Sequence, residues 1–288
     1  MAPRKVVVVT GSSTGGIGHA ICEEFAHQDC IVYATARRLS SLSSLPENVH
    51  KVKLDVVDPE SCKHAIDLVI SEQGRIDVLV NNAGMGGTGP LLDANVESED
   101  GAKATFETNF WAPLRLAKLV VPHMAERREG LIVNVGSVVG NIPTPWSGIY
   151  GASKAALHSA TEVLRMEVQG FGVNVMLVAP GAITSQFGSK QVESIKMPED
   201  SLYKEVADKI VDRANLSQRG DHSAPAAVLA KGIVSRSLRP RPAAYYTAGG
   251  KSLVMWIFER LPRRLVSWIM ARALGTTLVG KARKTKAA

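Results

Sequence analysis

The sequence predicts a single α/β domain in which helices cover both faces of a doubly wound (Rossmann) parallel sheet. Short runs of β-branched residues alternate with amphipathic helical segments about every 25–30 residues, the pattern of right-handed strand–helix–strand crossovers. A glycine-rich turn directly follows the first run, and neither an internal repeat nor a linker interrupts the alternation. With 288 residues, 45% of them hydrophobic and 21% charged, the chain can bury a large core.

The first strand is expected at residues 5–10, because a continuous β-branched run fits a strand that is buried on both faces. The glycine-rich turn occupies residues 10–18, and residues 19–26 then carry apolar side chains at helical spacing. A strand, a glycine turn and a helix in this order direct backbone N–H groups toward a pyrophosphate. A turn that only joins a strand to a helix is the alternative, but clustered glycines favour a dinucleotide site.

The second strand, expected at residues 31–35, is followed by Ala36, Arg37 and Arg38 with no acidic residue nearby. In dinucleotide folds an acidic residue after this strand binds the ribose hydroxyls of NAD, whereas arginine accommodates the 2′-phosphate of NADP. The sequence therefore favours NADPH/NADP+ as the cofactor. Solvated surface arginines beside an NAD site are the alternative.

Later strands are expected at residues 49–54, 76–80, 131–135, 173–178 and 245–247. A helix is expected at 59–73, and a long helical stretch at 100–128 should be kinked or broken by Pro113 and Pro122. Ligands in open α/β sheets bind beyond the carboxyl ends of the strands. The turn at 11–18, the segment 81–84, Ser137 and Pro180 all fall at such ends, so we expect the functional site there.

Tyr150 and Lys154 are four residues apart in a segment with helical periodicity, so a phenol and an ammonium project from the same face about one turn apart. A nearby cation favours the phenolate, so such a tyrosine can exchange a proton closer to neutral pH. An ordinary helix with a half-buried tyrosine and a solvated lysine is the alternative on this pair alone. The other motifs decide between them.

Together these motifs resemble the short-chain dehydrogenase/reductase family of single-domain Rossmann enzymes. The resemblance covers about residues 5–250 and lies in the order and spacing of the motifs. They are the glycine turn, Asn81-Asn82-Ala83-Gly84, Asn109, Ser137 thirteen residues before Tyr150, Lys154 and Pro180-Gly181.

The resemblance implies a catalytic role for four residues. Tyr150 would protonate the substrate carbonyl oxygen during reduction, and Ser137 would hydrogen-bond the same oxygen. Lys154 would lower the pKa of Tyr150 and hydrogen-bond the nicotinamide ribose. Asn109 would help to pass protons through water to Lys154. The hydride would come from the cofactor.

The resemblance also implies a set of cofactor-binding residues, with Asp55 at the adenine and Asn82 beside the adenine ribose. The set is Gly11, Ser13, Gly15, Gly16, Ile17, Gly18, Arg37, Arg38, Asp55, Asn82, Ala83, Gly84, Tyr150, Lys154, Pro180, Gly181, Ile183 and Ser185. The sequence departs from the family pattern by one extra residue in the turn, so either Gly15 or Gly16 takes the middle position. Spacing favours Ser185 over Thr184 as the nicotinamide contact.

Within the family, residues 34–38, residues 149–156 and the apolar, basic C-terminus are most similar to fungal and yeast 1-acyldihydroxyacetone-phosphate reductases, and also resemble the retinol and 17β-hydroxysteroid dehydrogenase branch. The resemblance implies NADPH-dependent reduction of a ketone or aldehyde on a small lipophilic substrate. A phosphorylated substrate of that kind would need a cation, for which Lys190 or Lys196 are candidates. A steroid, retinoid or polyketide ketoreductase is the alternative, and a non-catalytic dinucleotide-binding regulator is an alternative of another class.

The substrate pocket is expected between residues 85–91, residues 138–146 and a long polar loop from 187 to about 221, whose composition suggests a mobile lid. Residues 1–250 would form the Rossmann domain, residues 251–280 short amphipathic helices, and residues 281–288 a basic disordered tail.

The C-terminal helices, expected at 253–258 and 261–270, combine Trp, Phe and Leu with arginines, as helices at a membrane surface do. Residues 249–288 contain nine Lys or Arg and one Glu, against a net charge of +7 for the whole chain, so the preceding body is close to neutral. Peripheral binding to endoplasmic reticulum or lipid droplets through residues 251–274 is one expectation. Walling the substrate pocket or packing in a subunit interface are the alternatives.

Other features exclude several classes of function. Cys22, Cys30 and Cys62 lack the spacing of a disulfide framework or a zinc site, and the histidines lack metal-ligand spacing, so no metal is expected. A near-neutral body argues against a nucleic-acid partner. Without a secretory signal before the first strand, an intracellular, cytoplasmic location is expected. The resemblance implies a homodimer or homotetramer packed through the helices around Asn109 and Tyr150.

Overall fold

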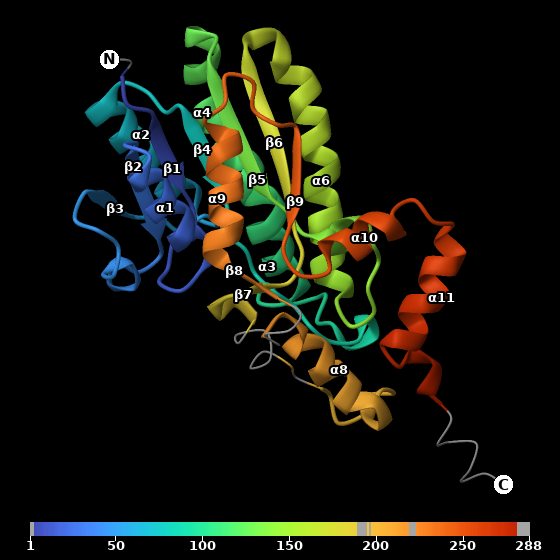
Figure 1. Ribbon diagram of the computed structural model, residues 1–288. Coiled ribbons are helices and arrows are strands. Elements are labelled where there is room, and N and C mark those ends of the chain that lie inside the picture. Colours follow the sequence, from blue (N-terminus) through green and yellow to red (C-terminus); the bar gives the residue numbers. More distant parts are fainter. Residues whose placement is uncertain (1–2, 189–194, 196, 219–222, 281–288) are drawn as a thin grey trace, which may run out of the picture.

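The computed structural model describes residues 3–188, 195, 197–218 and 223–280. At its centre is a parallel sheet of seven strands in the order β3-β2-β1-β4-β5-β6-β9 (Figure 1). The strands are β1 (Val6–Val9), β2 (Ile31–Ala36), β3 (Val49–Lys53), β4 (Val78–Asn81), β5 (Gly130–Val135), β6 (Val173–Pro180) and β9 (Tyr245–Ala248). The strand order reverses direction between β1 and β4, which confirms the predicted doubly wound fold.

Helices cover both faces of the sheet (Figure 1). On one face lie α1 (Ile17–His27) and α9 (Ala226–Ser237); on the other lie α2 (Pro59–Gln73), α4 (Ala112–Arg127) and α6 (Gly148–Val168). Alternate valines of β1 enter different cores, because successive side chains of a strand point to opposite faces. Val7 and Val9 pack under α1 and α9, whereas Val6 and Val8 pack under α2 and α4. All four are buried, which explains the uninterrupted apolar run.

The long helical stretch differs from the prediction in how it is interrupted. It consists of α3 (Ala102–Phe106), a π-helical turn (Glu107–Trp111) and α4, which continues through Pro122 without ending. Pro113 occupies the first turn of α4, where a missing N–H is tolerated more easily than in a helix interior. The interruption is therefore the π-helical turn, which contains Asn109, and not a break at either proline.

Two segments expected to be loops contain helices. Ser137 begins a short helix, α5 (Val138–Asn141), by accepting a hydrogen bond from the N–H of Val139. Within the segment expected to be a long polar loop lie a 3₁₀ turn (Lys204–Val206), α8 (Ala207–Ala214) and a second 3₁₀ turn (Asn215–Gln218). Val206, Ile210 and Ala214 recur at helical spacing and are buried, which explains the helix.

Two further short strands, β7 (Ile183–Thr184) and β8 (Ala224–Pro225), pair beside this segment. The predicted lid includes residues 189–194, 196 and 219–222, which lie outside the described residues, as do the candidate phosphate ligands Lys190 and Lys196.

The C-terminal helices α10 (Ser252–Phe258) and α11 (Arg263–Ala273) fold back toward the body. Val266 and Met270 form a small apolar core with Ile142 of the segment after α5. The indole N–H of Trp146 donates to the carbonyl oxygen of Leu274 at 2.8 Å, and a 3₁₀ turn (Thr276–Leu278) follows. No helix in the described part of the chain is both long enough and apolar enough to cross a bilayer. The predicted tail, residues 281–288, lies outside the described residues.

Candidate active site

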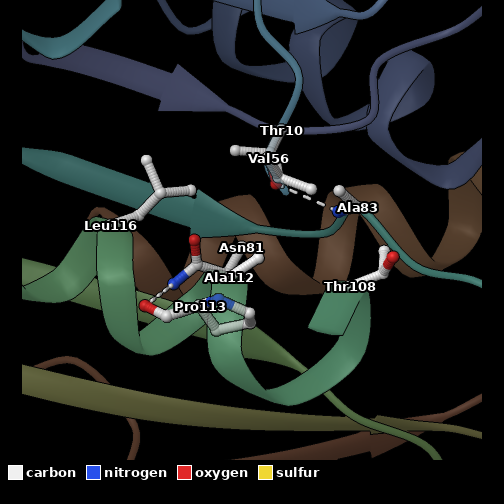
Figure 2. Close-up of a pocket in the computed structure, with 8 residues that line it drawn as sticks. All are labelled: Thr10, Val56, Asn81, Ala83, Thr108, Ala112, Pro113 and Leu116. Carbon is white, nitrogen blue, oxygen red and sulfur yellow. Dashed lines mark hydrogen bonds between the residues drawn. The ribbon is translucent and has the colours of Figure 1, made fainter. Parts of the chain in front are cut away.

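The ends of β1 and β4 are tied together by Thr10 and Asn82. The hydroxyl oxygen of Thr10 accepts hydrogen bonds from the backbone N–H groups of Asn82 and Ala83, each at 3.0 Å. The side-chain amide of Asn82 donates to the carbonyl oxygens of Thr10 at 2.9 Å and Gly11 at 3.0 Å. Figure 2 shows Thr10 and Ala83 meeting at one side of a small pocket. These bonds hold the glycine turn against the segment 81–84, as expected from the place of both at the carboxyl ends of strands.

The glycines of the turn are required by backbone conformation and by close approach. Gly11 has a φ of +69°, and a Cβ there would lie 2.7 Å from the Cα of Ala83. A Cβ at Gly18 would lie 2.5 Å from the side-chain nitrogen of Asn82 and 2.6 Å from the carbonyl oxygen of Gly11. Gly15 has a φ of +71°, whereas Gly16 has a φ of −95° and is the residue before the first turn of α1. Of the two glycines left open by the sequence, Gly15 therefore occupies the left-handed position.

The start of α1 suits the pyrophosphate of a dinucleotide. Among the described residues no side chain caps this helix, so its first N–H groups, at Ile17 and Gly18, are available to an anion. Gln186 covers the turn, because its N–H donates to the carbonyl oxygen of Gly15 at 3.3 Å and its side chain lies against Gly15. Gln186 was not identified from the sequence. The donors and the close glycine packing together fit a nicotinamide dinucleotide.

Arg37 and Arg38 are exposed at the end of β2, beside a cluster of hydroxyl groups. The hydroxyl of Ser13 donates to that of Ser41 at 3.1 Å, and the hydroxyl of Ser41 donates to the carbonyl oxygen of Arg38 at 2.6 Å. Thr14 donates to the carbonyl oxygen of Ser41 at 3.0 Å. Guanidinium groups and hydroxyls at one place can bind a phosphate. Thr14 and Ser41 were missed because only the folded chain brings the turn and this segment together.

Asp55 lies two residues after the end of β3, at the edge of the sheet where the resemblance places the adenine. Its N–H donates to the hydroxyl of Ser61 at 3.0 Å, and its carboxylate accepts from the N–H of Val57 at 3.3 Å. The neighbouring Val56 lines the pocket of Figure 2 together with Thr10 and Ala83. Asp55 therefore lies close to the glycine turn.

Ser137, Tyr150 and Lys154 meet at the end of β5. Lys154 is only 4% exposed and donates to the carbonyl oxygen of Val135 at 2.8 Å. Its ammonium lies 5.9 Å from the ring centre of Tyr150, and burial lowers the pKa of Lys154 to about 8. Burial raises the pKa of Tyr150, and hydrogen bonding with Ser137 and the positive charge of Arg213 oppose that rise. The effect of Lys154 on Tyr150 in the cofactor complex stays a prediction.

Asn109 connects the segment after β4 to the catalytic helix. Its side-chain amide donates to the carbonyl oxygen of Met85 at 2.8 Å and to the hydroxyl of Ser153 at 2.9 Å, and its side-chain oxygen accepts from the N–H of Met85 at 2.8 Å. Ser153 in turn donates to the carbonyl oxygen of Tyr150 at 2.8 Å. Asn109 is fully buried in the π-helical turn, a kind of turn that is frequent at functional sites. The proton-relay role of Asn109 stays a prediction. The hydrogen bonds through Ser153 show that Asn109 helps to position the start of α6.

Gly84 leaves room beside these groups. A Cβ at Gly84 would lie 3.4 Å from the side-chain oxygen of Asn109 and 3.7 Å from the ammonium of Lys154. All three predicted residues therefore border the same space.

His158 is a buried residue behind the site, and the sequence predicted no functional role for it. The N–H of Ser137 donates to its Nε2 at 3.2 Å, and its Nδ1 lies 2.6 Å from the side-chain oxygen of Asn141. This arrangement requires a neutral ring with the proton on Nδ1. Burial and the charge of Lys154 lower the pKa of His158 to about 4. His158 therefore holds the backbone of Ser137 in place as a neutral acceptor.

The segment after β6 brings Pro180, Gly181, Ile183 and Ser185 to the same edge. A Cβ at Gly181 would lie 2.2 Å from the carbonyl oxygen of Gly250, so only glycine fits there. Ser185 is buried, whereas Thr184 is exposed and its hydroxyl lies 2.6 Å from that of Ser223. The burial of Ser185 favours it over Thr184 as the nicotinamide contact, which agrees with the preference from spacing.

The three segments that were predicted to line the substrate pocket contact one another in their described parts. Gly89 donates from its N–H to the carbonyl oxygen of Trp146 at 2.9 Å. The ring of Trp146 lies 5.7 Å from that of Tyr203, and the ring of Tyr150 lies 5.9 Å from that of Phe187. The ring of Phe187 therefore lies against Tyr150, and Trp146 and Tyr203 form a second aromatic pair.

A family model, curated relatives and solved structures all assign this chain to the same family. The family model for short chain dehydrogenases matches residues 5–196. A short-chain dehydrogenase of Penicillium ochrochloron is 33% identical over 94% of this chain and 98% of its own length. The NADPH-dependent 1-acyldihydroxyacetone phosphate reductase of Schizosaccharomyces pombe is 32% identical over 75% of this chain and 73% of its own length.

Among solved structures, a short-chain dehydrogenase from Streptomyces avermitilis superposes with a TM-score of 0.78 at 28% identity, covering 96% of this chain and 99% of its own. The chain therefore belongs to the short-chain dehydrogenase family, whose members are oxidoreductases that bind a nicotinamide dinucleotide.

Proposed function

We propose that this protein uses NADPH to reduce a ketone or aldehyde on a lipophilic substrate to the alcohol. The observation that supports this most directly is the meeting of Tyr150 and Ser137, beside the buried Lys154, at the sheet edge that holds the glycine turn. Hydroxyl donors at one point suit a carbonyl oxygen that gains negative charge.

In this proposal the bound nicotinamide supplies the hydride. Tyr150 donates the proton to the carbonyl oxygen, and Ser137 hydrogen-bonds the same oxygen. His158 keeps Ser137 in position through the backbone N–H. Asn109 keeps the first turns of α6 in position through Ser153.

Two observations support NADPH as the cofactor. Arg37 and Arg38 are exposed after β2, where the hydroxyl of Ser41 accepts from Ser13 and donates to the carbonyl oxygen of Arg38, and arginines at this position suit a 2′-phosphate. The S. pombe relative is described as NADPH-dependent.

A lipophilic substrate is supported by the ring of Phe187, which lies 5.9 Å from that of Tyr150, and by the pair Trp146 and Tyr203 in segments expected to line the pocket. The substrate that the name of the S. pombe relative states, 1-acyldihydroxyacetone phosphate, combines an acyl chain with a ketone and is our first candidate, which would place the protein in lipid metabolism. A steroid, retinoid or polyketide ketone is the second candidate.

The test is NADPH and NADH oxidation, measured in parallel across a panel of ketones that includes 1-acyldihydroxyacetone phosphate, a steroid and a polyketide-like diketone. We expect turnover of at least one lipophilic ketone with NADPH. The double variant Arg37→Ala/Arg38→Ala should raise the KM for NADPH by about 10- to 100-fold and leave the KM for NADH nearly unchanged, because one lost charged hydrogen-bonding group costs about 1.5–3 kcal/mol. Similar effects on both cofactors would contradict NADPH specificity.

We also propose that residues 251–274 associate reversibly with a lipid surface, so that a cytoplasmic protein can reach a membrane or a lipid droplet. Although one side of these helices packs against Ile142, large apolar side chains remain exposed on the other. They are Leu253, Val254, Trp256, Ile257, Leu265 and Trp268. Arginines accompany them: Arg260 lies 3.5 Å from the ring centre of Trp256, and Arg272 lies 4.4 Å from that of Trp268. Such a surface suits anionic headgroups over acyl chains.

Co-sedimentation with anionic vesicles at low and high salt tests this association. Trp268→Glu should reduce the pelleted fraction, whereas Phe171→Glu should not, although both side chains are 53% exposed. Absence of pelleting of the parent protein at either salt concentration would reject the proposal.

For the oligomeric state we propose a homodimer or homotetramer packed through α4 and α6. Val163 and Met166 on the outer side of α6 are large, apolar and exposed. Light scattering of the parent and of a Met166→Glu variant tests this, and a monomeric parent would contradict it.

A further inference from the structure

Arg213 reaches the substrate side of the molecule from α8. This helix packs through Ile210, which is fully buried against Trp146. Arg213 lies three residues after Ile210, on the same side of the helix, and is partly buried. Trp146 precedes Tyr150 by only four residues, so the inner side of α8 faces the region of the catalytic helix.

Arg213 also lines a cavity of about 290 Å³ between α8 and residues 272–278. Three contacts hold residues 274–280 against neighbouring segments beside this space. Trp146 is hydrogen-bonded to Leu274, Lys209 packs against Gly275, and the N–H of Gly280 is hydrogen-bonded to Glu205. Gly275 has a φ of +74°, the left-handed conformation that turns the chain after α11. The cavity is large enough for a phosphate or a carboxylate with its attached carbon atoms.

The cavity has a positive charge. Lys209, Arg213 and Arg272 line it, with Asp212 as the acidic residue. Lys209 is paired with Asp208 at 3.1 Å and with Asp212 at 4.0 Å, and the guanidinium of Arg272 stacks on Trp268. Arg213 forms no hydrogen bond or ion pair with any residue that the structure describes. A guanidinium that is partly removed from water and has no acidic partner among the described residues favours an anion from outside them.

Arg213 and Tyr150 are close enough to influence each other electrostatically, since the charge of Arg213 opposes the rise in the pKa of Tyr150. Since Ile210 of the same helix packs against Trp146, four residues before Tyr150, we expect a substrate with its carbonyl at Tyr150 to reach Arg213 with another group.

We propose that Arg213 and the cavity between α8 and residues 272–278 bind an anionic group of the substrate, a phosphate or a carboxylate, while its carbonyl is reduced at Tyr150. This inference rests on the proposed reductase activity. It identifies Arg213 as a specificity-determining residue and the substrate as an anionic, lipophilic ketone. It offers a cation within the described part of the chain, whereas the candidates Lys190 and Lys196 lie outside it and stay predictions.

The experiment compares matched substrates that differ only in charge. One pair is 1-acyldihydroxyacetone phosphate and its dephosphorylated form, and the other is a long-chain keto acid and its methyl ester. Kinetics are measured for the parent, Arg213→Met, Arg213→Lys and a control, Arg239→Met, which removes an exposed arginine after α9 and changes the net charge equally.

We expect Arg213→Met to raise the KM for the anionic member of the preferred pair by about 10- to 100-fold, the usual effect of losing a charged hydrogen bond. The neutral member should change less than about threefold, Arg213→Lys should recover part of the loss, and Arg239→Met should match the parent. The pair that shows the larger effect identifies phosphate or carboxylate. Equal losses for charged and neutral ketones would overturn the inference, because Arg213 would then act on Tyr150 or on folding.

A binding measurement separates this inference from the proposed function. If no ketone is turned over, calorimetric titration of the NADPH-bound protein with both members of each pair still tests Arg213. Tighter binding of the anionic member that disappears in Arg213→Met supports the anion site without reductase activity. Equal affinities in the parent reject the site, whatever the catalytic result.

Discussion

The ammonium of Lys154 donates a 2.8 Å hydrogen bond to the carbonyl oxygen of Val135 while lying 5.9 Å from the ring centre of Tyr150. The positive charge of Lys154 is thus stabilised by a backbone carbonyl oxygen at the end of β5 and not by an acidic side chain. Keeping an ammonium there costs stability, which the protein tolerates at a functional position.

Lys154→Met should therefore lose activity and change the pH dependence of stability. Because burial lowers the pKa of Lys154 from 10.5 to about 8, the unfolded chain binds more protons than the folded one between these values. The stability of the parent relative to the variant should rise by up to about 3 kcal/mol as pH increases from 8 to 10.5. Urea unfolding of both proteins at pH 7, 8.5 and 10 measures this. A constant difference would show that the ammonium is not destabilised by burial.

His158 should make the stability of the folded protein depend on pH in the acidic range. Its pKa falls from 6.5 to about 4 in the folded protein, so its contribution to stability is complete above pH 6.5 and is lost as the pH falls toward 4. The parent should lose up to about 3 kcal/mol relative to His158→Phe over this interval, again from the linkage relation. His64→Phe, which replaces an exposed histidine of α2, serves as the control and should show no such loss.

The His158→Phe variant also tests whether His158 positions the backbone of Ser137. Without the Nε2 acceptor, the N–H of Ser137 has lost its partner, so kcat should fall while the dissociation constant for NADPH stays close to that of the parent. Unchanged kcat would mean that the position of Ser137 does not depend on His158.

Gly18→Ala should disrupt the dinucleotide site. The new methyl group would lie 2.5 Å from the side chain of Asn82 and 2.6 Å from the carbonyl oxygen of Gly11, so the turn must move. Overpacking of about 1–3 kcal/mol corresponds to a loss of about 5- to 150-fold in NADPH affinity, measurable by fluorescence titration. Gly74→Ala is the control. It strains a φ of +70° but meets no atom within 4 Å, so it should cost stability and leave NADPH affinity unchanged. Parental affinity in Gly18→Ala would contradict the site.

Local sequence patterns were sufficient to predict the sheet and the pairing of Tyr150 with Lys154 on one side of a helix, whereas the catalytic roles came from the family resemblance. The valines of β1 are buried on both faces, so the strand is visible as an unbroken apolar run. Tyr150 and Lys154 lie on one helix, where their spacing alone places them on the same side. The turn glycines are visible because backbone conformation and close approach admit no other residue at Gly11 or Gly18.

Contacts between distant segments could not be predicted in this way. Asn109 was identified only through resemblance, and its bonds to Met85 and Ser153 depend on how three elements pack. His158 resembles any helical histidine until Ser137 is placed beside it. Arg213 lies in a segment whose polar composition suggested a loop, although Val206, Ile210 and Ala214 follow helical periodicity. Such residues become identifiable only when burial and partners are known.

A single-turnover comparison of the parent with Tyr150→Phe tests most directly whether Tyr150 donates the proton. The measured quantity is the rate of hydride transfer from NADPH to the preferred ketone. We expect the variant to bind NADPH like the parent but to reduce the ketone about 100- to 10,000-fold more slowly, the usual contribution of a positioned general acid. Equal rates in the two proteins would contradict the assignment of Tyr150 as the proton donor.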